Sequence, residues 1–108
     1  DTPGLDVESV TGMVGGGAQV VVFTTGLGTP TGNPIAPVIK ITGNARTAQT
    51  MADNTDLDVS GILDHSESID GAADRLLREI VDVSSGKLTS AKRLGHREFA
   101  IHRRNPTI

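Results

Sequence analysis

Cysteine, tryptophan and tyrosine are absent from this sequence of 108 residues, and phenylalanine occurs only twice. Without cysteine, neither a structural disulfide nor a thiolate zinc site can form, and nothing in the sequence marks an oxidising compartment. With almost no aromatic rings, the core has to be built from Val, Ile, Leu and Ala, which bury less area per residue. We therefore expect one small core and a single domain over residues 1–108.

A strong excess of either charge is also absent, because ten Lys and Arg residues stand against thirteen Asp and Glu residues. Most cations are dispersed, which argues against a surface for nucleic acid. One late basic group, which we interpret as a solvated edge, consists of Lys92, Arg93, His96, Arg97, His102, Arg103 and Arg104.

Long apolar runs are missing as well. No stretch approaches the roughly 20 apolar residues that a membrane-spanning helix needs. The opening DTPGLD has neither the charged nor the apolar region of a signal peptide. The sequence thus predicts a cytoplasmic domain that binds neither membranes nor nucleic acid.

Helical patterns recur at intervals along the chain. Short helices are predicted over residues 6–13 and 45–51, and a longer one over residues 69–83. In the longer one, apolar residues recur three and four positions apart, as on one face of a helix. Ser66 or Ser68 can cap its start, and Gly86 can end it.

Strand patterns fill the intervals, and they are predicted over residues 18–23, 37–42, 57–59 and 98–102. The first is apolar except for Gln19, which is typical of a strand buried on both faces of a parallel sheet. The last, EFAIH, alternates like an edge strand with Phe99 and Ile101 toward the core. The alternation of helix and strand predicts a small three-layer, Rossmann-like α/β domain with a mostly parallel sheet.

The loop FTTGLGTPTGN, residues 23–33, follows the first predicted strand. In parallel sheets, ligands bind beyond the carboxyl ends of strands. Its glycines allow a close backbone approach, and its Thr and Asn residues supply short hydrogen-bonding side chains. The loop could hold a carboxylate, a phosphate or a polyol, although it is no Walker A motif. The alternative is that its glycines and threonines only make turns.

Lys40 lies inside the apolar strand PVIKI. A buried ammonium without a partner is costly, so Lys40 either reaches solvent from an edge or meets an anion. Asp64 and His65 suggest a general acid or base, although a surface loop is the simpler interpretation.

No group of residues has the spacing of a metal site. His65, His96 and His102 are dispersed. The acidic residues Asp53, Asp56 and Asp58 are interpreted as a solvated loop, with a site for a hard cation as the alternative.

Three stretches resemble the C-terminal part of the altronate/galactarate dehydratase family, which also includes sulfolactate sulfo-lyase large subunits. They are DTPGLDVESVTGMVGGGAQVVVFTTGLGTPTG (1–32), PVIKITGN (37–44) and SGKLTSAKRLGHREFAI (85–101). They run in family order, and FTTG-x-GTP-x-G followed by P-x-x-K-x-x-x-N is long enough to be specific.

The resemblance implies a hydro-lyase, a carbon–oxygen lyase that removes water from altronate, galactarate or a related hydroxy acid. It implies that this chain is the C-terminal domain of a longer enzyme, contributes substrate-contacting loops and is inactive alone. A divalent metal, Fe²⁺ or Mn²⁺, would be held by residues outside these 108, in N-terminal and central domains, and the enzyme could be a homo-oligomer. The implied substrate-binding residues are Thr24, Thr25, Gly26, Gly28, Thr29, Lys40 and Asn44.

One departure and two alternatives accompany this resemblance. Leu27 stands where many relatives carry Arg, so a guanidinium contact to the carboxylate is absent there. The domain could instead belong to a sulfolactate sulfo-lyase. It could also be a scaffold or oligomerisation module whose loop never touches a ligand. The sequence identifies neither the catalytic acid nor the catalytic base.

Overall fold

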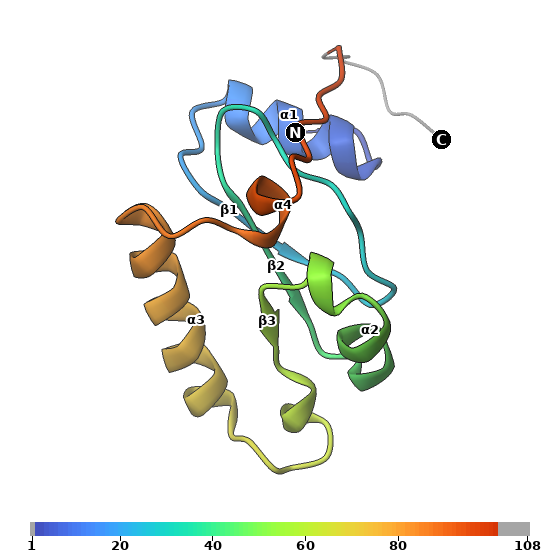
Figure 1. The fold of residues 1–108 in the computed structure, drawn as a ribbon, viewed down its shortest axis with the longest axis vertical. Helices are drawn as coiled ribbons and strands as arrows, with labels where there is room; N and C mark the ends of the chain where they lie inside the picture. Colours follow the sequence, from blue (N-terminus) through green and yellow to red (C-terminus); the bar gives the residue numbers. More distant parts are fainter. Residues whose placement is uncertain (1, 102–108) are drawn as a thin grey trace.

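The computed structural model describes residues 2–101 (Figure 1). In chain order the helices and strands are α1 (Asp6–Gly15), β1 (Val21–Thr24), β2 (Val38–Thr42), α2 (Ala45–Thr50), β3 (Leu57–Asp58), α3 (Ile69–Ser84) and α4 (Ser90–Arg93), with 3-10 turns η1 (Ala52–Asn54) and η2 (Ser60–Ile62). The strands form one parallel sheet in the order β1-β2-β3. None of the described helices is long and apolar enough to cross a membrane.

Helices cover both faces of this sheet. Successive strand residues point to opposite faces, so Val38 and Ile41 lie on different sides of β2. On one side, Val10 of α1 packs with Val21 and Val38 into the buried core. On the other side, Ile41 lines a hollow together with Ala72 and Leu76 of α3. In Figure 1 the sheet lies between α1 and α3, which confirms the predicted three-layer α/β class.

β2 is the central strand, and every one of its residues is buried. The prediction that residues 18–23 form a strand buried on both faces was wrong. The strand there is β1, which is shorter and lies at the edge of the sheet. Only Val21 of β1 is buried, whereas Val22 is 39% exposed. A run of valines cannot reveal which strand has a neighbour on each side.

The Asp56 carboxylate joins three parts of the fold. Its Oδ2 accepts a hydrogen bond from the Lys40 amide of β2 at 2.8 Å, and the Asp56 amide donates to the Lys40 carbonyl at 2.8 Å. Its Oδ1 accepts from the Ser90 amide at the start of α4, at 2.6 Å. This short helix was not predicted; Thr89 caps it by accepting from the Lys92 amide.

α3 matches the predicted helix to within one residue, and Ser68 caps it by accepting a hydrogen bond from the Gly71 amide. Gly86, just beyond the helix, has a φ of 115°. The buried residues of α3 are Ala72, Glu79 and Val83. Most of the apolar repeat that marked this helix in the sequence is therefore left on the surface.

The predicted strand over residues 98–102 was wrong for its described part, residues 98–101, which contains no strand. Phe99 and Ile101 are 71% and 84% exposed, not in the core. The Ala100 amide donates to Thr11 Oγ1 of α1, so this segment is held by a helix side chain and not by a strand. His102 lies outside the described residues, as do Arg103 and Arg104.

Asp56→Ala should lower the free energy of unfolding by about 3 kcal/mol, because two amides lose a charged acceptor in a part-buried setting. Urea denaturation monitored by circular dichroism measures this change. Asp53→Ala is the matched control: Asp53 is exposed, and its replacement should change stability by less than about 0.5 kcal/mol. Equal effects of the two substitutions would contradict the role given to Asp56.

Candidate functional site

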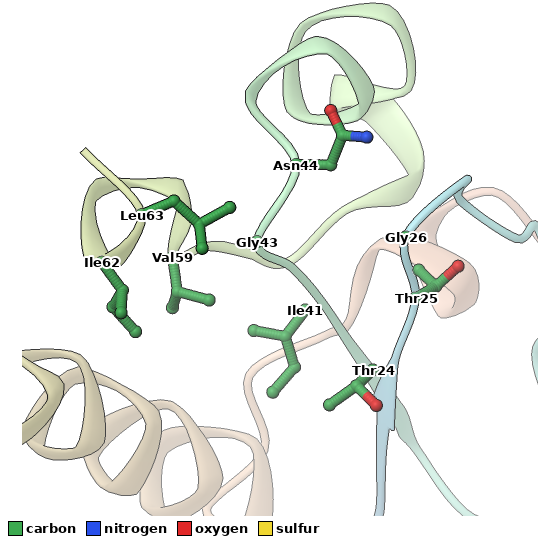
Figure 2. Close-up of a pocket in the computed structure, with 9 residues that line it drawn as sticks. All are labelled: Thr24, Thr25, Gly26, Ile41, Gly43, Asn44, Val59, Ile62 and Leu63. Carbon is green, nitrogen blue, oxygen red and sulfur yellow. The ribbon is translucent and has the colours of Figure 1, made fainter.

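A pocket of about 490 Å³ lies where the loops after the three strands meet (Figure 2). All three strands are parallel, so their carboxyl ends share one edge of the sheet, where ligands bind in such folds. The residues that line it are Thr24, Thr25, Gly26, Ile41, Gly43, Asn44, Val59, Ile62 and Leu63.

Two of the polar side chains at the pocket already hold the loops in place. Thr25 Oγ1 accepts the Gly28 amide at 3.0 Å, and Figure 2 shows this hydroxyl directed away from Val59 and Leu63. Asn44 Oδ1 caps α2 by accepting the amides of Arg46 and Thr47. Hydrogen bonds within the protein thereby hold the loop after β1 and the start of α2.

Other groups on the pocket residues remain free. Among the residues that the structure describes, none bonds the Thr24 hydroxyl, the Asn44 Nδ2 group, or the amides of Gly26 and Gly43. Amide N–H groups donate only, and a hydroxyl can donate as well. This edge therefore suits a ligand rich in oxygen acceptors, such as a carboxylate or a polyol.

The opposite wall of the pocket is apolar. It consists of Ile41 together with Val59, Ile62 and Leu63, which come from the segment after β3 (Figure 2). The sequence patterns did not predict this wall. The one hint of the wall in the sequence is that three apolar residues end or follow the shortest predicted strand. This pattern does not reveal which loop these residues face.

A second hollow of about 340 Å³ adjoins the pocket at Gly43 and Asn44 and reaches Asp64. Asp64 Oδ1 accepts the Ser66 amide at 2.9 Å, and hydrogen bonds from the Ser66 side chain and backbone lower the pKa of the Asp64 carboxyl. Asp64 is consequently ionised near neutral pH and has no proton to give as a general acid. Its neighbour His65 has a φ of 62°, so it sits in a tight turn.

Gly28 and Thr29, also predicted to bind substrate, do not line this pocket. Gly28 has a φ of 88°, and a Cβ at this position would collide with the Met51 sulfur and crowd Thr47. Thr29 is 5% exposed, and its hydroxyl is 2.9 Å from that of Thr31. Both residues shape the loop from within.

Lys40 is also apart from the pocket. Its position on β2, one residue before Ile41, directs its side chain to the opposite face of the sheet. The side chain is 1% exposed, and within residues 2–101 its Nζ has no hydrogen-bond partner. Burial lowers the pKa of the Lys40 ammonium, and the nearby carboxylates of Asp56 and Glu98 only partly oppose this.

Glu98 belongs to the C-terminal segment that packs on the glycine-rich loop. Its Oε2 accepts the Gly32 amide at 3.1 Å, and a Cβ on Gly32 would collide with the His96 carbonyl. Burial works against ionisation of Glu98, but the amides of Glu98 and Gly32 and the charges of His96 and Lys40 together lower the pKa of its carboxyl. The loop and this segment thus pack together, and they bring the Glu98 carboxylate near the Lys40 ammonium.

The acidic residues of the predicted cation alternative serve other roles. Asp56 binds two amides, Asp58 Oδ1 accepts the Ser60 amide at 2.8 Å, and Asp53 is exposed. Across residues 2–101, no three His, Asp or Glu side chains are grouped so that they could hold a metal ion. The described residues alone therefore offer no metal site, and the resemblance places the ligands of its implied metal outside these 108 residues.

The amino-acid sequence of this chain matches a known protein family. The family model for D-galactarate/Altronate dehydratase, C-terminal, matches residues 1–107. The chain is 41% identical over 103 residues to the (2R)-sulfolactate sulfo-lyase subunit beta of Chromohalobacter salexigens. It is 32% identical over 106 residues to the altronate dehydratase of Escherichia coli, and 38% identical over 86 residues to the galactarate dehydratase (L-threo-forming) of the same organism.

These relatives are much longer than the matched region. The alignments cover 95%, 98% and 80% of this chain, but only 26%, 21% and 16% of the sulfo-lyase subunit, the altronate dehydratase and the galactarate dehydratase. The chain therefore spans about a quarter or less of the curated relatives it matches.

Lys40→Met should raise the free energy of unfolding at pH 7 by about 1 to 3 kcal/mol, because it removes a buried ammonium that lacks a hydrogen-bond acceptor. The pKa of Lys40 is lower in the folded chain than the ordinary value of 10.5. Between these two values the unfolded chain binds the extra proton, so stability rises with pH there. Lys40→Met should abolish this rise.

Urea denaturation at pH 7 and at pH 9.5 measures both effects. Lys92→Met is the control, because Lys92 is exposed, and it should shift stability by less than about 0.5 kcal/mol. If Lys40→Met destabilised the fold instead, attraction to Asp56 and Glu98 would outweigh the cost of burying the ammonium.

Proposed function

Because this chain belongs to the D-galactarate/altronate dehydratase family, whose C-terminal domain it matches, we propose that it is the C-terminal domain of a sugar-acid dehydratase. The longer enzyme would remove water from altronate, galactarate or a related hydroxy acid. The present domain would bind and orient the substrate. A cytoplasmic location and a homo-oligomeric state, both expected from the sequence, stay predictions.

The observation that carries this proposal is the set of free hydrogen-bonding groups at the carboxyl ends of β1 and β2. The Thr24 hydroxyl, the amides of Gly26 and Gly43, and Asn44 Nδ2 all belong to residues of one pocket. A sugar acid presents carboxylate and hydroxyl oxygens, which accept such bonds. Leu27, 88% exposed at this loop, brings no guanidinium, so binding would rest on backbone and hydroxyl groups.

Dehydration of a hydroxy acid is a β-elimination. A base takes the proton next to the carboxylate, the electron pair forms the new double bond, and the hydroxyl on the following carbon leaves as water after protonation. We assign none of these proton transfers to the described residues of the pocket. Their part is to hold the carboxylate and hydroxyls in a fixed orientation, which itself lowers the barrier.

The divalent metal belongs to the same proposal for the longer enzyme. Bound Fe²⁺ or Mn²⁺ would stabilise negative charge that develops on the substrate oxygens. Its ligands would come from outside these residues.

A sulfolactate sulfo-lyase domain is the second candidate. The 41% identity to the sulfo-lyase subunit favours it. Sulfolactate and the sugar acids share a carboxylate beside a hydroxyl-bearing carbon, and that shared part is what the free donors of the pocket would address. The two candidates differ in the group that leaves, which lies outside the contacts proposed for this domain.

Thr24→Val tests the proposal in the full-length protein that contains this chain, assayed with altronate, galactarate and sulfolactate in the presence of Fe²⁺ or Mn²⁺. It removes one hydroxyl that bonds no other described residue, so no hydrogen bond of the described fold is lost. We expect kcat/KM for the active substrate to fall about tenfold, the worth of one hydrogen bond to a charged group. Thr25→Val is a less clean test, because it also removes the acceptor for the Gly28 amide.

Thr50→Val is the matched control, since its hydroxyl bonds only the Arg46 carbonyl of its own helix. It should leave kcat/KM unchanged. Full activity of Thr24→Val would sink the binding role of the pocket. That outcome would leave the remaining alternative, a scaffold or oligomerisation module.

A further inference from the structure

Only part of the apolar face of α3 points at the sheet, since Leu77 and Val81 are exposed. With 100° between successive residues, Ile69, Ala73, Leu77, Ile80 and Val81 occupy an arc of about 120°, which we call the α3 stripe. The buried residues occupy a different, narrower arc, centred about 110° away; they are Ala72, Glu79 and Val83. Only part of the helix's apolar surface is therefore used by the described fold.

The exposed fractions and the charges of these side chains agree with the separation of the two arcs. In the α3 stripe, Ile69, Leu77 and Val81 are 70%, 60% and 55% exposed. The carboxylate-bearing Glu79, in contrast, is only 8% exposed and is neutralised by Lys87 Nζ at 2.7 Å. An amphipathic helix that buries a glutamate and exposes Leu77 and Val81 has apolar surface that its own sheet does not cover.

The α3 stripe continues into the candidate pocket. Ile69 and Ala73 line an apolar hollow together with Ile41, Val59 and Ile62. The last three also line the pocket. A partner that covers the stripe would therefore reach the apolar wall of the pocket, whose outermost residue, Leu63, is 75% exposed.

The length of the relatives indicates what this partner is. Nearly all of this chain aligns with 26% of the sulfo-lyase subunit and 21% of the altronate dehydratase. Interfaces between domains of one chain bury roughly 600 to 1,500 Å². The α3 stripe and the pocket wall form a continuous apolar surface on which the rest of such a protein can pack.

We propose that the α3 stripe docks another domain of the same polypeptide, and that this contact closes the apolar side of the pocket. The docked domain presents an apolar surface to Leu77 and Val81. This inference rests on the longer protein and not on the reaction, so its test does not use activity.

The test uses the full-length protein with Leu77→Cys, and with Arg78→Cys as the matched control. Both positions are exposed in this structure, and they are neighbours on different faces of α3. The chain has no cysteine of its own, so a maleimide adduct on the peptide with residue 77 or 78 comes from the introduced thiol. In the native protein, Leu77→Cys should react at least roughly tenfold more slowly than Arg78→Cys, because only its face is covered.

Equal labelling rates of the two variants in the native protein would overturn the proposal. In denaturant we expect equal rates, which would show that the two thiols are intrinsically alike. The partner is then identified by photo-crosslinking from p-benzoylphenylalanine at position 77. A crosslink to peptides outside these 108 residues, within a product of single-chain mass, supports the proposal. A product of twice the chain mass on a denaturing gel would show a second copy on the stripe and overturn it.

Discussion

One carboxylate fixes the geometry on which the rest of the fold depends. Asp56 supplies both a backbone donor and a side-chain acceptor to Lys40 of β2, and its second oxygen holds the amide of Ser90. β3 has only two residues, so its ladder with β2 is short, and the Asp56 side chain lengthens that contact by one residue. Asp56 thus fixes the entry of the chain into β3, and the bond from the Val59 amide to the Thr42 carbonyl at 2.9 Å fixes its exit toward the apolar wall of the pocket.

Local patterns predicted the elements that are stable for local reasons. α3 has a strong apolar repeat and a capping serine, and β2 has a compact apolar run, so both could be read from the sequence. The wrong predictions concern which other helix or strand an element packs against. Alternation at Phe99 and Ile101 resembles an edge strand, but whether an adjacent strand edge is free depends on distant parts of the chain.

The same division applies to the candidate site. Thr24 and Thr25 could be predicted because polar residues directly after an apolar strand mark the carboxyl edge of a parallel sheet, whereas Asn44 was implied only by the family resemblance. Val59, Ile62 and Leu63 were missed because they reach the pocket only through the folding of a third loop. The family resemblance groups Lys40 with the loop, whereas the pleat of β2 places its side chain on the other face of the sheet.

The bond from the Gly28 amide to Thr25 Oγ1, with the bond from Thr47 Oγ1 to the Gly26 carbonyl, has a consequence for the thermodynamics of ligand association. These bonds within the protein restrain the loop, so little conformational entropy is lost when a ligand docks. Affinity at this edge is then set by how well a ligand replaces the water on the free donors. Ligands of similar size would consequently be discriminated by the placement of their oxygen atoms, and hardly by their ability to reshape the loop.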